Sequence, residues 1–404
     1  MKILIVSQYF WPEHFRINDL AITLQQLGNE VSVLTGLPNY PKGHYYQGYS
    51  IKKNSDEKWQ NISIYRCKMR PRGHGSLQLV RNYLSYAYQA IKKSKMLEEQ
   101  NFDLLYVFGV SPLTSALPAI HLKKKWKIPI ILNVQDLWPE YVTAITGLKN
   151  PIGVRILDKL MRYIYRSCDK ILISSKSYEQ SIQRYLGTKS NKIMFWPQYA
   201  TVEKVAKSKV LFDEMAFHIV FTGNIGEAQG LDIAIETADM LKDFHVQWHF
   251  IGTGRYMTKL AAMVKQKKLE KCVIFHGWIP EVQVPQYLAS ADAALLILKD
   301  DDVFKMALPA KLQTYMACGV PIVGCVKGES KRILLEAEAG IVTDEISAAG
   351  LANVCKQFLT CPKERYDRLC KNAQAYGKAH FDKQVLIGQL IKEMRELKDE
   401  YIQR

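Results

Sequence analysis

The sequence lacks long apolar runs and any pattern typical of an export signal. No stretch approaches the roughly 18 apolar residues that a membrane-spanning helix needs, so we expect no segment to cross a bilayer. The first apolar run, residues 3–6, is too short for the core of a signal peptide, and polar Gln8 follows it closely. We therefore expect the chain to stay in the cytoplasm.

Cysteines are few, and their spacing forms no motif. The eight cysteines include no CxxC pair and have no histidine at a metal-ligand spacing. Most of them lie in apolar or helical surroundings, as reduced cysteines of a protein core do. We therefore expect neither a zinc site nor disulfides, which favours a reducing compartment.

The second half of the chain has almost no net positive charge. The formal net charge is +16, and residues 1–200, with 28 Lys and Arg against 13 Asp and Glu, hold +15 of it. Solubility alone does not require this imbalance. It indicates an anionic partner for the first half: nucleic acid, anionic lipid headgroups or a phosphorylated substrate.

Apolar, β-rich runs alternate with helix-period segments along nearly the whole chain. This alternation predicts parallel strands joined by right-handed helical crossovers, and hence an α/β fold of doubly wound sheets. The pattern stops at a polar, Lys-rich linker over residues 196–212 and then restarts. The predicted strands are residues 2–7, 31–35, 62–66, 104–109, 128–134 and 170–175, then 217–223, 246–252, 272–277, 293–298, 321–325 and 340–343.

We therefore expect two Rossmann-like domains, residues 1–198 and 199–380, followed by a C-terminal helix over 381–404. The tail from residue 362 is predicted to be helical throughout. Doubly wound sheets bind ligands beyond the carboxyl ends of their strands. With two such sheets, we expect the site in a cleft between the domains, lined by the loops that follow strands.

The loop after the first strand, residues 7–18, is long, aromatic and of mixed charge. It lacks the GxGxxG sequence of a dinucleotide site. One interpretation is a substrate-facing loop that presents Glu13, Arg16 and Asn18. The alternative is a packed loop anchored by Trp11.

Two further loops of the first half carry candidate substrate-binding residues. The loop 36–48 interleaves tyrosines with basic side chains, which suits sugar stacking and phosphate binding. After the strand at 128–134, Asp136 and Glu140 flank Trp138 and are candidates for orienting or deprotonating an acceptor hydroxyl. An aspartate that caps a helix is the alternative there. The candidates of the loop 36–48 are Asn39, Tyr40, Lys42 and His44.

Glycines stand where the strands of the second half end. Gly223 and Gly226 permit close approach of the backbone to an anion and precede a helix N-terminus. Glycine is common at such turns, so this signal is weak alone. The loops after the next two strands add candidate contacts to a ribose, a phosphate or a base: Gly254, Arg255, Trp278 and Ile279.

The segment 307–323 is the most informative part of the second half. Pro309 suits a first helical turn, and Lys311 then lies where a cation is unfavourable beside the positive helix end. An anion held jointly by the helix N–H groups and the ammonium would explain this lysine; a solvated surface lysine is the alternative. Glu329, after the next strand, is a candidate for a ribose or sugar hydroxyl, or an ordinary residue of a helix start.

Five segments together resemble the retaining glycosyltransferases of family four, which have the GT-B architecture of two facing Rossmann-like domains. The resemblance covers the whole chain and implies a C-terminal helix that crosses back onto the N-terminal domain. The sequence is similar to enzymes of O-antigen, capsule and colanic-acid repeat units, and most of all to N-acetyl-L-fucosamine transferases. The segments are SQYFWPEHFRINDLA, TGLPNYPKG, VQDLWPE, FTGNIGEAQGL and LPAKLQTYMACGVPIV.

The resemblance implies transfer of N-acetyl-L-fucosamine, or a related amino or deoxy sugar, from UDP to a polyprenyl-diphosphate-linked saccharide, without a metal or other cofactor. The second domain would hold the donor and the first the acceptor. Lys311, Asp136 and Glu140 would be catalytic. The implied donor-binding residues are Gly223, Asn224, Gly226, Gln229, Gly254, Arg255, Trp278, Ile279, Pro309, Thr314, Tyr315 and Glu329.

The sequence departs from this family in two places. Many members have two glutamates eight positions apart where this chain has Met306 and Thr314, which leaves Glu329 as the candidate for ribose recognition. Many also have an Arg and a Lys where this chain has Asn224 and Gln229. Lys311 then remains the main cation for the diphosphate. Further candidates are Lys305, Lys331 and Arg332.

A lipid-linked acceptor would give the basic first half a partner, the anionic inner face of the cell membrane. Basic clusters at 66–72, 92–95 and 123–127 suit its headgroups, and the amphipathic segment 77–97 is either an interfacial helix or an ordinary crossover. Two alternative functions remain. One is a nucleotide-sugar epimerase or hydrolase on the same fold, against which the lack of a recognisable His/Glu acid–base set in the donor half argues only weakly. The other is a non-catalytic, basic nucleic-acid-binding protein, for which the sequence has the charge but no helix-turn-helix, zinc-finger or RNP pattern.

Overall fold

The computed structural model describes the whole chain except residues 54, 74, 147–149, 188–189, 202–210, 213–214 and 404. The chain forms two compact units, of which unit 1 comprises Met1–Trp196 and Gln389–Arg404 and unit 2 comprises Pro197–Gly388. The sequence had placed these boundaries after residues 198 and 380. Most of the predicted linker, residues 202–210, lies outside the described residues.

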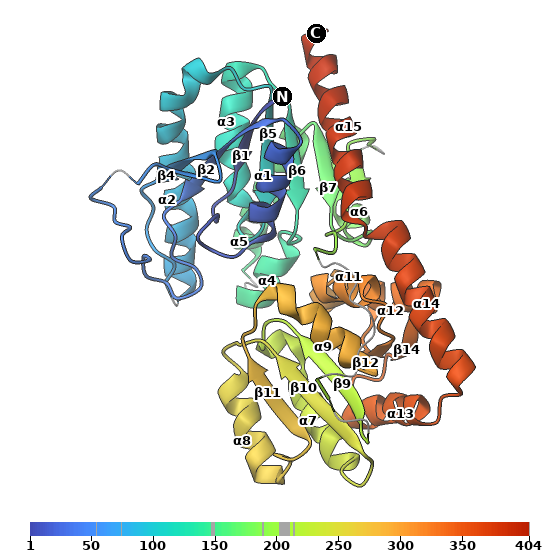
Figure 1. The fold of residues 1–404 in the computed structure, drawn as a ribbon. Coiled ribbons are helices and arrows are strands. Elements are labelled where there is room, and N and C mark those ends of the chain that lie inside the picture. Colours follow the sequence, from blue (N-terminus) through green and yellow to red (C-terminus); the bar gives the residue numbers. More distant parts are fainter. Residues whose placement is uncertain are drawn as a thin grey trace. The chain divides into compact units, whose positions relative to one another are not determined.

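Unit 1 is built on an eight-stranded sheet of order β3-β4-β2-β1-β5-β6-β7-β8 (Figure 1). The central strands are largely apolar and buried along nearly their whole length because helices cover both faces of the sheet. Only the edge strand β3 is antiparallel to its neighbour. The strands are β1 (Lys2–Val6), β2 (Glu30–Gly36), β3 (Glu57–Trp59), β4 (Ile62–Cys67), β5 (Leu104–Gly109), β6 (Ile130–Val134), β7 (Lys170–Ile173) and β8 (Ile193–Phe195).

All six strands predicted for the first half are confirmed, whereas β3 and β8 were missed. Each of these two has only three residues, too few for an alternating pattern to stand out. The missed β3 pairs with β4 through a tight turn in which Gln60 and Asn61 both have positive φ. Asparagine tolerates this conformation better than most residues.

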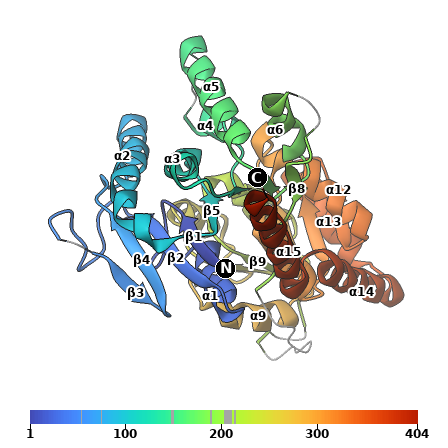
Figure 2. The same ribbon diagram turned by 90° about the horizontal axis from the view of Figure 1, so that it is seen from above.

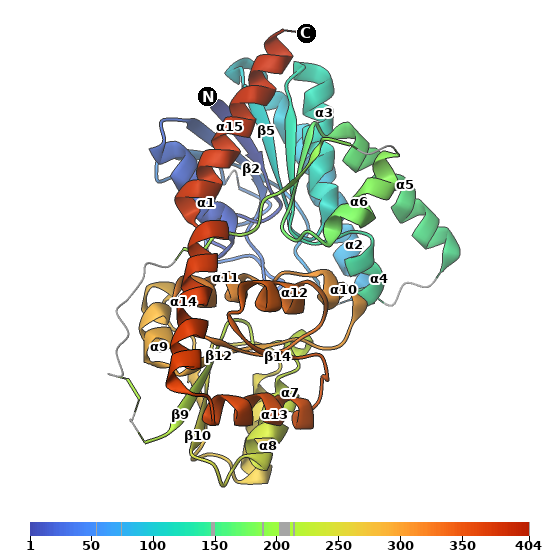
Figure 3. The same cartoon turned by 90° about the vertical axis from the view of Figure 1, so that its right-hand side faces the viewer.

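The helices of unit 1 lie on both faces of the sheet, as right-handed crossovers require. One face carries α1 and part of α15, and the other carries α2, α3, α5 and α6 (Figures 2 and 3). The short α4 follows β6. The helices are α1 (Arg16–Gln26), α2 (Ser76–Ser94), α3 (Ala116–Trp126), α4 (Glu140–Thr146), α5 (Pro151–Ser167), α6 (Tyr178–Leu186) and the 3-10 turns η1 (Lys95–Gln100) and η2 (Leu113–Ser115).

Unit 2 is built on a fully parallel six-stranded sheet of order β11-β10-β9-β12-β13-β14. All six strands predicted for this half are confirmed. Their apolar side chains form one core with α7, α8 and α13. The strands are β9 (Phe217–Thr222), β10 (Val246–Ile251), β11 (Val273–Gly277), β12 (Ala293–Ile297), β13 (Ile322–Cys325) and β14 (Gly340–Thr343).

The helices of unit 2 are also divided between the two faces. The crossovers that lead from β9 to β11 use α7 and α8, and those that lead back through β12 to β14 use α9, α11 and α12. The helices are α7 (Leu231–Met240), α8 (Met257–Lys267), α9 (Val284–Ser290), α10 (Asp302–Met306), α11 (Ala310–Ala317), α12 (Gly328–Ala337), α13 (Ala348–Leu359), α14 (Lys363–His380) and the 3-10 turns η3 (Glu227–Gln229) and η4 (Glu281–Gln283).

The C-terminal tail, predicted to be helical throughout from residue 362, consists of two helices with a short break between them. α14 ends at His380, and α15 (Lys383–Ile402) begins after a break at Phe381 and Asp382. Phe381 is buried, and Asp382 Oδ1 accepts the N–H of Val385. From Gln389 onward α15 belongs to unit 1, so the crossing back of the C-terminal helix is confirmed.

Candidate functional site

In unit 2, the two loops that follow β9 and β10 pack directly on each other at the carboxyl edge of the sheet. The N–H of Ile225 donates to the carbonyl of Thr253 at 2.9 Å. A methyl group on Gly252 would lie 1.9 Å from the carbonyl oxygen of Gly223, and one on Gly254 would lie 2.1 Å from that of Ile225. Gly252 and Gly254 are therefore approached closely by the backbone of the loop after β9.

Lys311 reaches from α11 to the glycine loop after β9. Pro309 is the residue before the helix, so Lys311 lies in the first turn, as the sequence predicted. Its Nζ donates to Gln229 Oε1 at 2.5 Å and lies 3.7 Å from the ring centroid of Phe221. A methyl group on Gly223 would lie 3.9 Å from the same nitrogen. The structure thus brings Gly223, Gln229 and Lys311 together.

The ammonium of Lys311 has no carboxylate within ion-pair distance among the described residues. The other cations considered for this edge are paired: Lys305 with Asp300 and Asp302, Lys331 with Asp344, and Arg332 with Glu329 and Glu336. Burial holds the pKa of Lys311 well below its ordinary value. Lys311 is therefore not a solvated surface lysine, and an anion placed beside it would supply its missing charge partner.

Several predicted donor contacts lie in the loops at the same carboxyl edge of the sheet. Asn224 and Arg255 are exposed, Trp278 is 67% exposed, and Ile279 is half-buried. Gly226 lies against Asn224, because a methyl group there would be 2.8 Å from Asn224 Nδ2. Their place beyond β9, β10 and β11 keeps them available to a bound ligand.

Three predicted donor contacts have structural partners instead. The Tyr315 hydroxyl is buried and accepts the N–H of Thr222 at 2.9 Å, which fixes the end of β9. The Thr314 hydroxyl is buried and donates to the carbonyl of Ala310. The Glu329 side chain is 3% exposed and holds Arg332 through both oxygens. Polar residue types alone could not distinguish these internal bonds from ligand contacts.

In unit 1, the loop 7–18 has the packed form that was the alternative to a substrate-facing loop. Glu13 is 1% exposed, and its carboxylate accepts the N–H groups of Phe10, Asn39 and Tyr40 at 3.3, 2.8 and 2.7 Å. Burial raises the pKa of Glu13 to about 7, although these three donors lower it. Glu13 thus ties the loops after β1 and β2 together through its carboxylate.

The neighbouring candidates share this structural role in part. Asn18 accepts the N–H of Trp11 and donates to the carbonyl of Glu13, and the Trp11 ring stacks on Trp59 at 5.5 Å between centroids. Arg16 begins α1 and is half-buried.

In the loop 36–48, Asn39 is buried. Its Nδ2 donates to the carbonyl of Leu37, and its Oδ1 accepts the backbone N–H of Arg72. Asn39 is therefore also structural, whereas Lys42 and His44 are exposed.

The two candidate carboxylates after β6, Asp136 and Glu140, contact different partners. Asp136 Oδ2 accepts the N–H of Ser111 at 2.8 Å, and burial raises its pKa. Asp136 is thus bonded to the loop after β5 and does not cap a helix. Glu140, the first residue of α4, pairs with Arg184 of α6 at 3.0 Å. The buried Trp138 donates to Ser111 Oγ at 3.0 Å, next to Asp136.

The sequence missed a cluster at the carboxyl edge of this sheet. Tyr9, Tyr40 and Tyr83 surround the guanidinium of Arg72, whose carbon lies 5.3 Å from the Tyr40 ring centroid. In the sequence, Arg72 belongs to the basic cluster 66–72, which is predicted to suit lipid headgroups. The sequence feature that could have indicated this cluster is an aromatic residue after each of the first two strands, Tyr9 and Tyr40.

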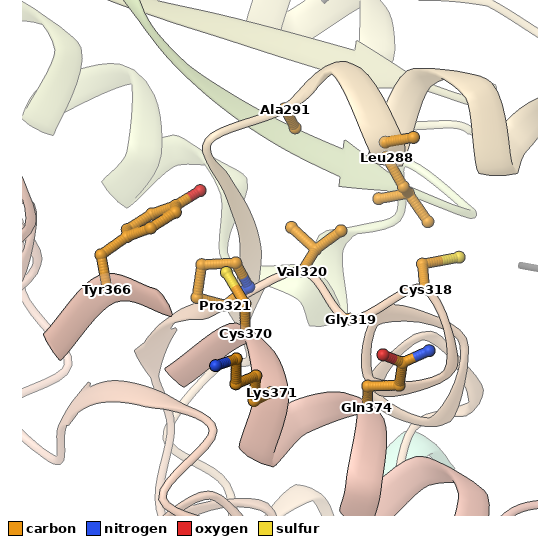
Figure 4. Close-up of a pocket in the computed structure, with 11 residues that line it drawn as sticks. Leu288, Ala291, Cys318, Gly319, Val320, Pro321, Tyr366, Cys370, Lys371 and Gln374 are labelled. Atoms are coloured by element: carbon orange, nitrogen blue, oxygen red, sulfur yellow. The ribbon is translucent and has the colours of Figure 1, made fainter. Parts of the chain in front are cut away.

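A partly open pocket of unit 2 lies at the opposite edge of its sheet. It has a volume of about 170 Å³ and is lined by the turn 318–321 before β13 and by α14 (Figure 4). Tyr366, Cys370 and Gln374 of α14 face it. Because these positions precede strands, the cavity belongs to the amino edge and not to the candidate site. Across the described residues, no group of three or more His, Cys, Asp or Glu is placed to hold a metal ion, and no helix could span a membrane.

Two family models match the chain. Residues 14–198 match the model "Glycosyl transferase 4-like domain", and residues 216–361 match "Glycosyl transferases group 1". The chain is 23% identical to the putative colanic acid biosynthesis glycosyl transferase WcaI of Escherichia coli K12, over 98% of this chain and 100% of that protein.

Solved structures show the same GT-B fold. Sucrose-phosphate synthase of Thermosynechococcus elongatus superposes with a TM-score of 0.77 at 15% identity, over 98% of each chain. Anabaena HepE in complex with UDP superposes with a TM-score of 0.71 at 14% identity, over 98% of this chain and 100% of that one.

Proposed function

Because this chain belongs to the glycosyltransferases described by the two family models, we propose that it is a retaining enzyme that takes a sugar from UDP without a metal. The observation that carries the proposal is Lys311, a desolvated cation at the start of α11 that has no carboxylate partner among the described residues. A nucleoside diphosphate fits this position, because helix N–H groups and an ammonium both attract its charge. The HepE structure with UDP supports UDP as the nucleotide.

The chemical step follows from this placement of charge. The bond between the anomeric carbon and the diphosphate oxygen breaks, and an acceptor hydroxyl oxygen forms the new bond on the same face of the sugar. The departing phosphate takes the proton of that hydroxyl. Lys311 and the N–H groups of α11 stabilise the charge that develops on the diphosphate, the role that oriented donors have in other group transfers. Asp136, half-buried at the carboxyl edge of unit 1, is the group that would orient the acceptor.

We propose surface-polysaccharide synthesis as the pathway and a polyprenyl-diphosphate-linked saccharide as the acceptor. The similarity to the colanic acid enzyme WcaI over nearly the whole of both chains supports the pathway. The sugar is proposed to be N-acetyl-L-fucosamine or a related amino or deoxy sugar, on the resemblance of the sequence segments alone.

The acceptor's lipid places the enzyme on the inner face of the cell membrane, and α2 suits that surface. Leu77, Leu84 and Tyr88 lie on one helical face and are 63%, 55% and 67% exposed. Exposed Arg81 and Lys92 lie on the same face. An apolar stripe flanked by cations binds anionic membranes by insertion and charge attraction.

Thermal stabilisation by UDP, GDP and TDP, each with and without magnesium, tests the donor site. We expect stabilisation by UDP alone, of equal size with and without the metal. A response to GDP or TDP instead would contradict the donor, and a requirement for magnesium would contradict metal-free binding. Incubation with donor and no acceptor separates transfer from hydrolysis or epimerisation, because a transferase should leave the donor intact.

Vesicle binding tests the membrane surface. The double variant Leu77→Glu and Leu84→Glu should lose co-sedimentation with vesicles containing phosphatidylglycerol. Leu335→Glu, at a leucine of α12 that is 58% exposed, is the matched control in unit 2 and should bind as the parent does. Equal binding by the double variant would rule out α2 as the contact.

A further inference from the structure

Most hydrogen-bond donors of Arg72 have no acceptor among the described residues. Arg72 follows β4 at the carboxyl edge of the sheet in unit 1, and it is half-buried. Its side chain makes one long hydrogen bond there, from Nη1 to the Tyr9 hydroxyl at 3.4 Å. No carboxylate in the described part of the chain lies within ion-pair distance of it. Since a guanidinium has five N–H groups, most of them are available to a ligand.

The position of Arg72 is nevertheless fixed by the loop after β2. Its backbone N–H donates to Asn39 Oδ1 at 2.7 Å, and its guanidinium lies over the Tyr40 ring. Gly43 of the same loop is so close that a methyl group there would lie 2.2 Å from the carbonyl oxygen of Arg72. An arginine held in this way loses little conformational freedom when it binds a ligand.

Four segments of unit 1 converge on this guanidinium. Tyr9 follows β1, Tyr40 follows β2, Tyr83 lies on α2, and Asp136 follows β6. Burial raises the pKa of Tyr83 and of Asp136, and in both groups the nearby charge of Arg72 opposes that rise. The cluster therefore combines one available cation with three aromatic rings at the edge where doubly wound sheets bind ligands.

We propose that Arg72 binds a phosphate oxygen of the diphosphate that joins the acceptor sugar to its lipid. The guanidinium fork matches the geometry of phosphate, and the neighbouring tyrosine rings suit the sugar beside it. This inference rests on the proposed acceptor. It assigns to Arg72 a role in the acceptor site and not in the attraction of lipid headgroups.

Calorimetric binding of farnesyl diphosphate and of farnesol to the full chain tests the assignment. Saturating UDP is present throughout, so that the diphosphate probe cannot occupy the donor site. Arg72→Gln should weaken binding of farnesyl diphosphate by about 10- to 100-fold, the value of a charge-assisted hydrogen bond, and leave farnesol binding unchanged. Arg72→Lys should recover part of the loss. Arg395→Gln, at an exposed arginine of α15 in unit 1, should change neither.

Three outcomes would overturn the proposal. If Arg72→Gln binds farnesyl diphosphate with the affinity of the parent, the guanidinium does not bind the diphosphate. Equal weakening towards farnesol would show a structural role. Weaker binding of Arg72→Gln to phosphatidylglycerol vesicles, with the diphosphate affinity intact, would assign Arg72 to headgroups. Absence of UDP stabilisation in the parent protein would contradict the proposed donor. Arg72→Gln would still test this assignment, because Arg72 lies in unit 1 and the proposed donor site lies in unit 2.

Discussion

The desolvated ammonium of Lys311 destabilises the unliganded protein, and a bound diphosphate would remove this destabilisation. Its ammonium is desolvated and has only the Gln229 amide oxygen as a hydrogen-bond partner among the described residues. Lys311→Met should therefore stabilise the free protein, by about 0.5–2 kcal/mol, and reduce its stabilisation by UDP. It should also lower kcat by about 10²- to 10³-fold, as the loss of one oriented donor does elsewhere.

Proton uptake gives a second readout of the same residue. An anion beside Lys311 raises its pKa, so UDP binding should take up a proton at pH values between the free and the bound pKa. Calorimetry in two buffers of different ionisation enthalpy measures this uptake. Lys311→Met should bind UDP weakly and without uptake. Unchanged uptake in that variant would assign the proton to another group.

Glu13 makes the stability of unit 1 depend on pH. Its pKa is about 7 in the folded chain against an ordinary value of 4.5, so the folded state holds the proton more tightly. The stability contributed by this group is fully present below about pH 4.5 and is lost as the pH rises through about 7. Urea unfolding of the parent and of Glu13→Gln should therefore show a difference in free energy that changes across this range. A difference independent of pH would contradict the raised pKa.

At the scale of elements, the glycine loops after β9 and β10 act as one packed pair. Gly252 has φ of +132° and faces the Gly223 carbonyl, so Gly252→Ala should destabilise unit 2. The backbone conformation alone costs about 1–3 kcal/mol, and the clash adds to it. Urea unfolding measures the effect. Gly388→Ala is the matched control, because nothing lies within 4 Å of its added methyl group and it is within α15. That change should stabilise by roughly 0.5–1 kcal/mol.

The strands and crossover helices could be predicted because their apolar patterns are local. The roles of loop side chains could not. Glu13 and Asn39 have the composition of ligand contacts, yet the N–H groups of Tyr40 and Arg72 make them structural partners. Those contacts join residues far apart in sequence, so no local pattern reports them. Lys311 was an exception, because a cation in the first turn of a helix is unfavourable without an anion.

At the scale of the molecule, the return of α15 completes unit 1. Leu390 and Met394 are fully buried, Glu393 pairs with Lys170 at 2.6 Å, and the Tyr401 hydroxyl donates to Asp169 at 2.7 Å. Met394→Ala should cost about 2–5 kcal/mol and increase hydrogen exchange in β5 and β7 without affecting β9 or β12. Met240→Ala, at a methionine of α7 that is 54% exposed, should change neither. Equal loss of protection in both units would show that they unfold as one.

Unit 1 consists of two segments that are separated in sequence by unit 2, so its two parts are synthesised at different times. Residues 1–196 leave the ribosome first, but the segment that covers Lys170 and Asp169 is made only after all of unit 2. Unit 2 is continuous in sequence and can fold as soon as it emerges. The nascent N-terminal sheet has α1 on the face that also carries α15, but the part that α15 covers must stay exposed until residues 389–403 arrive. A chaperone that shields apolar surface would therefore act on this face, and for the whole time that unit 2 takes to be translated.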